Sequence, residues 1–251
     1  MNWLDYFKSN AVNRAQVPWH LGLEIPDFIR PAFVRSLQKF QIGESGDGNN
    51  LRRQAATTCD PGYEATIDLF IKEEQEHARL MARVLTGLGA PLIKRDWSDA
   101  CFVLLRRLFG LNHELLVLLI PEIIAKRYFR ALHDGIPDPV VRAVCHQILH
   151  DEEGHVAFHI DTLQRAIRET GLLRRAATRV AWKSLFRLGC LVVMLDHGKI
   201  LKRCGVSRIQ FWWDAGLLFD EAAAGIFRWS SSPLLTRPSF ECVLKPNPAA
   251  R

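Results

Sequence analysis

The chain has 251 residues, of which 48% are hydrophobic and 24% are charged. These fractions are typical of a globular protein and exclude an intrinsically disordered chain. The longest apolar run, 188–195, has eight residues, whereas a membrane-spanning helix needs about 20, so we expect no such span. Lys and Arg exceed Asp and Glu by 33 to 27, which permits an acidic partner without requiring one.

The N-terminus and the cysteines point to a cytoplasmic protein. Residues 1–10 include Asp5 and lack a basic stretch followed by an apolar one, so we expect no signal peptide. The six cysteines are scattered and never form a C-x-x-C pair. In a chain without an export signal, such cysteines are expected to be reduced thiols.

The first half of the chain shows helical patterns bounded by turn residues. Residues 29–53 form the first candidate helix. Asp60 followed by Pro61 is typical of an N-cap and a proline at the first helical position, and the turn residues of 87–91 end the pattern. These signals predict a second helix over 60–87.

The second half repeats this organisation. Residues 98–134 are helical in pattern, with Gly110 and Pro121 as expected breaks or kinks. A second Asp-Pro pair, at 138–139, opens a helix that ends at Gly171. Two further helices are predicted over 173–203 and 208–227. Because few stretches alternate with a period of two, we predict an all-α protein.

The segments EEQEH and DEEGH each consist of an acidic residue followed by Glu-x-x-His. Residues three apart on a helix share a face, so Glu74 and His77 can bind one metal ion together. Glu152 and His155 have the same spacing. One such pair is common by chance, but two pairs in amphipathic helices are a much stronger indication of a metal site.

Both motifs lie on apolar helix faces. The first face consists of Ile67, Phe70, Glu74, His77, Met81 and Val84, and the second of Val141, Cys145, Ile148, Glu152, His155 and His159. Burying a carboxylate among apolar side chains is costly unless it is paired or bound to a metal. The two faces therefore favour metal binding over a pair of solvated surface groups.

The spacing of the acidic residues indicates an internal repeat. The two Glu-x-x-His motifs are 78 residues apart. Glu44 and Glu122 share this offset, and each lies 30 residues before a motif. Gly43 and Pro121 immediately precede them, and a local break or π-bulge there would aim each carboxylate inward.

Alternatives remain for both of these carboxylates. The glycines of 43–48 disfavour a helix, and a loop there would remove Glu44, with Glu24 as its replacement. Glu114 is the corresponding alternative to Glu122.

On these residues the sequence resembles the ferritin-like di-metal carboxylate superfamily. That group includes the ribonucleotide reductase small subunit, acyl-carrier desaturases, bacterial multicomponent hydroxylases, rubrerythrin and aldehyde-deformylating oxygenase. The resemblance covers about residues 29–168. It implies a four-helix bundle over 29–170, preceded by an N-terminal arm, 1–28. Additional packing helices of the same domain, 171–229, and an irregular tail, 230–251, would follow.

The resemblance also implies which residues hold the metals. One ion would be bound by Glu44, Glu74 and His77, and the other by Glu122, Glu152 and His155. Glu74 and Glu152 would bridge the two ions. Glu73 and Asp151 match the family's acidic position before the Glu, and each would partner a ligand histidine.

Three further observations carry alternatives. His159 lies one turn beyond His155 and is either a seventh ligand or a hydrogen-bonded core histidine. Tyr128 is either a redox-active catalytic residue or a packed tyrosine. Candidate walls of a substrate pocket are Phe40, Phe70, Met81, Phe129 and Phe158.

The C-terminal helices concentrate positive charge. Basic residues there are Arg174, Arg175, Arg179, Lys183, Arg187, Lys199, Lys202, Arg203 and Arg208. They form either a solvated face or a dock for an acidic carrier protein, a phosphate-bearing substrate or tRNA. The aromatic residues 211–213 either pack in the core or contribute to a homodimer contact.

Four carboxylates balance two divalent ions, and this oxygen-rich set with two imidazoles suits iron or manganese better than zinc or copper. The resemblance implies two iron ions, or manganese or a mixed pair, with dioxygen as co-substrate. We therefore predict a non-haem di-iron oxygenase, supplied by an external electron donor. It would hydroxylate, desaturate or otherwise oxidise an apolar or carrier-bound small molecule. The alternatives are an N-oxygenase of an amine, a tRNA-modifying hydroxylase and a ferroxidase or other metal-handling protein.

Overall fold

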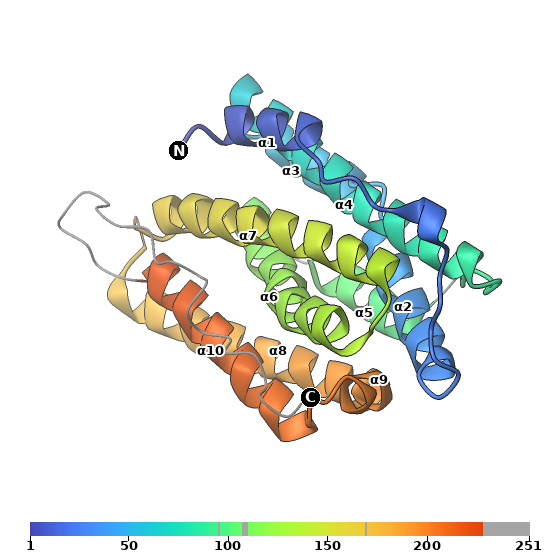
Figure 1. Cartoon of the computed structure of the whole chain (residues 1–251). Coiled ribbons are helices and arrows are strands. Elements are labelled where there is room, and N and C mark those ends of the chain that lie inside the picture. The colour runs from blue at the N-terminus through green and yellow to red at the C-terminus, as the bar shows by residue number, and fades with distance from the viewer. Residues whose placement is uncertain (95, 107–109, 169, 228–251) are drawn as a thin grey trace.

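The computed structural model describes residues 1–94, 96–106, 110–168 and 170–227, and every regular element in them is helical (Figure 1). The elements are α1 (Trp3–Val12), η1 (Trp19–Leu21), α2 (Arg30–Glu44), α3 (Asn49–Ala56), α4 (Pro61–Gly87), α5 (Trp97–Arg106), α6 (Leu111–Gly135), α7 (Pro139–Arg168), α8 (Leu172–Asp196), α9 (Gly198–Arg203) and α10 (Arg208–Phe227). The all-α prediction is confirmed for this part of the chain. The predicted irregular tail, 230–251, lies outside the described residues.

The long helices pack in pairs. α2 lies against α4, α6 lies against α7, and α4 contacts α7, which joins the two pairs. Figure 1 shows α8 and α10 side by side on the far side of α6 and α7, while α1 runs along α4. The apolar faces of these helices meet in one continuous core. The two predicted motif helices are thus neighbours at its centre.

The predicted continuous helix over 29–53 is wrong. α2 ends at Glu44, and α3 begins at Asn49 after a short loop. Gly48 has a φ of +68°, a conformation that side chains other than glycine rarely adopt. A Cβ atom on Gly48 would lie 2.6 Å from the side chain of Ile71, so the close approach to α4 also requires glycine.

Two other predicted boundaries also differ. Gly110 separates α5 from α6 as expected, but α6 continues through Pro121 without interruption. Most side chains of α6 are buried, so packing on several sides stabilises the helix across the proline. The predicted helix over 173–203 stops at Asp196, where buried His197 hydrogen-bonds to the hydroxyl of Ser36.

Residues 1–28, treated above as an arm, contain a helix that the sequence analysis did not predict. In α1 the inward positions are Trp3, Phe7 and Asn10, and both Phe7 and Asn10 are buried. A polar residue at the third inward position interrupts the apolar pattern on which helix prediction relies. The sequence pattern therefore does not indicate α1. The role of this helix is visible only from the contacts that Asn10 makes with other helices in the folded protein.

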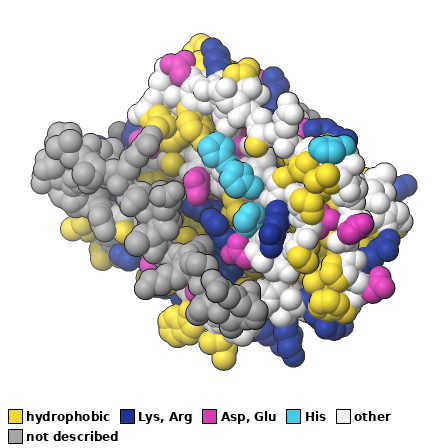
Figure 2. All heavy atoms as spheres, viewed as in Figure 1, with side chains coloured by type: hydrophobic (Ala, Val, Ile, Leu, Met, Phe, Trp, Pro, Cys, Tyr) yellow, Lys and Arg dark blue, Asp and Glu magenta, His cyan; other side chains and the backbone are white. Residues whose placement is uncertain are grey.

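The surface and the interior contain different histidines. Figure 2 shows histidine side chains gathered over α7 on one face of the molecule, where His146 and His150 are exposed. His77 and His155, in contrast, are completely buried.

Among the described helices, none combines the length and the apolar character that crossing a bilayer requires.

Replacing Gly48 with Ala should destabilise the protein by about 1–3 kcal/mol, because the left-handed backbone and the contact with Ile71 both oppose a side chain. Gly43→Ala is the matched control, since a Cβ atom there meets nothing within 4 Å. The control should leave stability unchanged or raise it by up to about 1 kcal/mol. Urea unfolding followed by circular dichroism measures both, and equal stabilities would contradict the assigned turn.

Candidate metal centre

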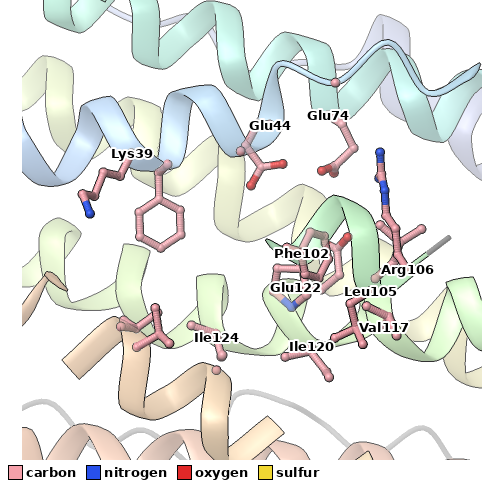
Figure 3. Close-up of a pocket in the computed structure, with 18 of the residues that line it drawn as sticks. Lys39, Glu44, Glu74, Phe102, Leu105, Arg106, Val117, Ile120, Glu122 and Ile124 are labelled. Atoms are coloured by element: carbon pink, nitrogen blue, oxygen red, sulfur yellow. The ribbon is translucent and has the colours of Figure 1, made fainter. Parts of the chain in front are cut away.

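Four helices contribute carboxylates or imidazoles to one buried region. α4 provides Glu74 with His77, and α7 provides the second Glu-x-x-His pair. Figure 3 shows the side chains of Glu44, at the end of α2, and Glu74 turned toward one another, with Glu122 of α6 across from them. The residues that share the 78-residue offset therefore meet in space.

The centre of this region is a group of one histidine and three glutamates. Glu74, Glu122, Glu152 and His155 each offer one ligand atom, and these atoms all lie within 4.8 Å of one another. Nδ1 of His155 is 2.9 Å from Oε1 of Glu74, 3.3 Å from Oε2 of Glu122 and 3.6 Å from Oε2 of Glu152. Such a group is close enough to hold a metal ion.

His77 faces the same group from the other side. Its Nδ1 is 3.7 Å from Oε1 of Glu74 and 3.7 Å from Oε1 of Glu152. Both glutamates therefore lie within 4 Å of the Nδ1 atoms of both histidines. This is the placement that a carboxylate bridging two ions requires.

Glu44 is not one of the four residues of the central group but lies beside Glu74, and burial together with the charge of Glu74 raises the pKa of Glu44. Gly43 lies within α2, and Gly46 and Gly48 lie in the loop after Glu44, so Glu44 keeps its place as the last residue of α2. Of the two alternatives, Glu24 is exposed. Glu114 is buried, but it accepts a hydrogen bond from Asn50 of α3.

The acidic residues that precede each motif glutamate pair across the helices. Nε2 of His77 lies 2.9 Å from Oδ2 of Asp151, and Nε2 of His155 lies 3.0 Å from Oε2 of Glu73. A carboxylate at Nε2 favours the tautomer that carries the proton there, which leaves the Nδ1 lone pair facing the glutamates. Each motif thus orients the histidine of the other.

The unpredicted helix α1 closes this outer layer. The amide nitrogen of Asn10 donates hydrogen bonds to Glu73 and Asp151, both of 2.8 Å. Arg14, just beyond α1, places a guanidinium nitrogen 3.1 Å from Asp151 and 3.7 Å from Glu73. The sequence carries no motif that could have identified these two residues, because they act only through the fold.

The pKa values of the cluster are shifted because several carboxyl groups lie close together in a buried region. Burial, reinforced by Glu74, raises the pKa of Glu44 well above its usual range, and burial with Glu122 does the same for Glu152. Burial opposes a charged His155, but the charge of Glu74 and hydrogen bonds that the ring donates to neighbouring carboxylates outweigh it and raise the pKa. The protein groups alone thus reduce their repulsion by holding protons.

The outer acid Asp151 behaves differently from the inner glutamates. Burial alone would raise its pKa, but the hydrogen bond from His77 and the charges of His77 and Arg14 lower it to about 2. Asp151 is therefore ionised at neutral pH. It remains a negative hydrogen-bond acceptor for His77.

The residues fit a metal centre on chemical grounds. Nδ1 of His77 and Oε2 of Glu152 are buried and have no hydrogen-bond partner. A buried polar atom without a partner costs about 1–3 kcal/mol, and cations between these groups would satisfy both atoms. The donor set of carboxylate oxygens and imidazole nitrogens matches iron or manganese.

A largely apolar cavity of about 550 Å³ adjoins the cluster. Glu44, Glu74 and Glu122 line it, whereas the two motif histidines do not. Of the predicted pocket walls, Phe40 and Phe70 line the cavity; Met81, Phe129 and Phe158 lie elsewhere in the core. The histidine side is therefore packed with protein, and the carboxylate side faces open space.

Tyr128 lies behind Phe40, on which its ring stacks at 3.9 Å between centroids. Its hydroxyl shares a 2.5 Å hydrogen bond with Ser36, which also bonds to His197. Burial raises the pKa of Tyr128 above its usual range. These contacts place the tyrosine in the core and do not test the predicted catalytic role.

His159 is completely buried one turn beyond His155, and neither of its ring nitrogens has a hydrogen-bond partner. Phe70 meets its ring edge to face at 5.3 Å. Burial lowers the pKa of His159 to about 4, so the ring is neutral at neutral pH. These contacts place His159 in the core without a protein hydrogen-bond partner and leave both alternatives above as predictions.

Comparison of the chain with protein-family models, with curated proteins and with solved structures finds no match.

Replacing Asn10 with Ala should lower metal affinity by about 10- to 100-fold, because the two outer acids lose the amide that holds them in place. Asn13→Ala is the matched control. Asn13 is an exposed residue at the end of the same helix and bonds only to Ser9. Competitive titration with a metal-binding dye measures both. Equal affinities would show that α1 does not support the site.

Proposed function

We propose that the Glu/His cluster binds two metal ions and that the protein is a non-haem di-iron oxygenase acting on an apolar small molecule. The observation that carries the proposal is the adjacency of the buried cluster to the apolar cavity. The proposal places the chain in the ferritin-like superfamily through its paired motifs.

Each ion would have its own histidine. Glu44 and His77 would bind the first ion, and Glu122 and His155 the second. Glu74 and Glu152 would bridge them, in keeping with their distances to both Nδ1 atoms. When bound, two ferrous ions supply electrons for the reduction of dioxygen.

The surrounding residues would orient the ligands and exclude water. Glu73 and Asp151 fix the two imidazole rings, and Asn10 and Arg14 hold these acids while covering the histidine side. Access is left on the carboxylate side, where the cavity lies. A substrate in the cavity would thus meet the glutamates, and not the histidines.

The cavity supports a mostly apolar substrate. Its walls include Ile71, Leu105, Val117, Leu118 and Ile120. The basic residues in the lining are Lys39 and Arg106, which Figure 3 places on opposite sides of the glutamates. Lys39 already forms ion pairs with Asp96 and Asp196. A ferroxidase, whose substrate is a metal ion, has no need of an apolar cavity of this size.

His159 favours a second candidate, an N-oxygenase of an amine with the same metal centre. A buried imidazole without partners, close enough to be influenced by the charges of Glu74 and Glu122, is a suitable additional ligand. If His159→Phe binds iron as well as the original protein does, His159 is not a ligand and this candidate loses its support.

Glu74→Ala and Glu152→Ala should each lose most of the bound iron, because each removes a carboxylate shared by both ions. The purified protein should contain two iron ions per chain, and after anaerobic ferrous loading it should consume dioxygen. Mass-spectrometric metal analysis and an oxygen electrode provide the two readouts.

The matched control for these variants is Glu76→Ala. Glu76 lies on the same helix as Glu74 but forms a surface ion pair with Arg79. The Glu76→Ala variant should bind iron and consume dioxygen as the unaltered protein does. Zinc alone in every preparation, or iron retained by Glu74→Ala, would contradict the proposed function.

A further inference from the structure

The C-terminal helices carry most of the net charge of the chain. Residues 171–227 contain nine Lys and Arg but only four Asp and Glu, a difference of five out of a total of +6. Two of these acids pair with basic residues from elsewhere: Asp196 with Lys39, and Asp214 with Arg127. The C-terminal helices therefore carry most of the net positive charge of the chain.

The outward face of α8 is apolar along its whole length. Leu172, at the start of the helix, is exposed, and the exposed large apolar side chains on this face are Leu173, Val180, Leu188, Leu191 and Leu195. Their spacing of seven, eight, three and four residues places them on one helix face, and the exposed residues between them on that face are Ala177 and Ser184. A solvated surface helix normally presents polar side chains there, so this stripe is unusual.

α10 adds a second apolar stripe next to the first. Ile209, Trp213 and Leu217 follow one another at intervals of four, and each is more than half exposed. α8 and α10 pack together through stacked Phe186 and Phe219, whose ring centroids are 4.4 Å apart. Both helices also contact α6, and Figure 1 shows them side by side.

The cavity beside the cluster reaches this surface. α8 forms one wall of the cavity through Leu185, Leu188, Gly189, Val192 and Val193. Leu188 lines the cavity and is also 56% exposed. The apolar stripe of α8 thus borders the cavity that leads to the glutamates.

We propose that the outward faces of α8 and α10, here called the docking face, bind the surface of an anionic lipid bilayer. Exposed apolar stripes on helices that also carry basic residues are features of helices that lie in the plane of a bilayer interface. Exposed Arg174 lies beside the stripe of α8, and Arg179, Lys202 and Arg203 are exposed elsewhere on α8 and α9, where they are available for lipid phosphates. The apolar substrate would then enter from the lipid beside Leu188, a step that rests on the proposed function.

Other partners match this face less well. A second copy of the chain would bring two positively charged faces together, which charge repulsion opposes. Nucleic acid and acidic proteins would satisfy the basic residues but would leave the apolar stripes without a partner. An anionic bilayer satisfies both features at once.

Co-sedimentation of the full chain with vesicles tests the docking face. The protein should bind vesicles of phosphatidylcholine with phosphatidylglycerol, and bind phosphatidylcholine alone at least about tenfold more weakly. Leu191→Glu and the double variant Arg174→Glu/Arg179→Glu should each weaken binding to the anionic vesicles by about tenfold or more. Matched controls on other helices are Val12→Glu and Lys72→Glu, both at exposed positions, and these should bind normally.

Tryptophan fluorescence provides a test that needs no charged variant. Vesicles with brominated acyl chains should quench Trp213, and Trp213→Phe should lose that quenching while the protein still sediments with vesicles. The proposal is overturned if the protein does not bind anionic vesicles, or if the docking-face variants bind them as the controls do. It is also overturned if sedimentation equilibrium shows a dimer that Leu191→Glu dissociates, or if tRNA competes away the bound vesicles.

The same assay separates this inference from the proposed function. Vesicle binding needs no metal, so protein stripped of metal should bind as well as iron-loaded protein. If the chain holds no iron but still binds anionic vesicles, the metal proposal fails and the docking face stands. If the chain binds iron and consumes dioxygen but does not bind vesicles, the docking face is wrong and the proposed function stands.

Discussion

Mutual repulsion among the glutamates in the core is the constraint on which the rest of the structure depends. Glu44, Glu74, Glu122 and Glu152 converge from four helices, and burial makes an uncompensated charge costly there. Protons shared between them relieve part of the repulsion, whereas two divalent cations would neutralise all four charges. In the proposed metal centre, the outer layer of Glu73, Asp151 and α1 would hold the two histidines in place for these cations.

Sequence reasoning locates this centre well because its determinants are local. A Glu and a His three residues apart share a helix face, and the 78-residue offset brings Glu44 and Glu122 to the same place as the motifs. Sequence reasoning does not identify features that depend on contacts between distant parts of the chain. Asn10 reaches the acids of α4 and α7 only after α1 has packed, and the break near Gly48 depends on a close approach to Ile71.

The two sides of the centre have separate tasks. On one side, α1 packs against the outer acids and leaves the histidines enclosed. On the other, α2, α4, α5, α6 and α8 enclose an apolar cavity that the glutamates face. Of the helices that follow the paired motifs, α8 forms one wall of this cavity, and Leu188 belongs both to that wall and to the apolar outer stripe of α8.

The most direct test of the central claim is the position of bound iron in a crystal of the iron-loaded protein, measured by anomalous scattering at the iron edge. Our account predicts two peaks about 3.5–4 Å apart, lying between Glu74 and Glu152 with one histidine on each side. A peak confined to the surface histidines of α7, or no iron among the glutamates, would contradict it.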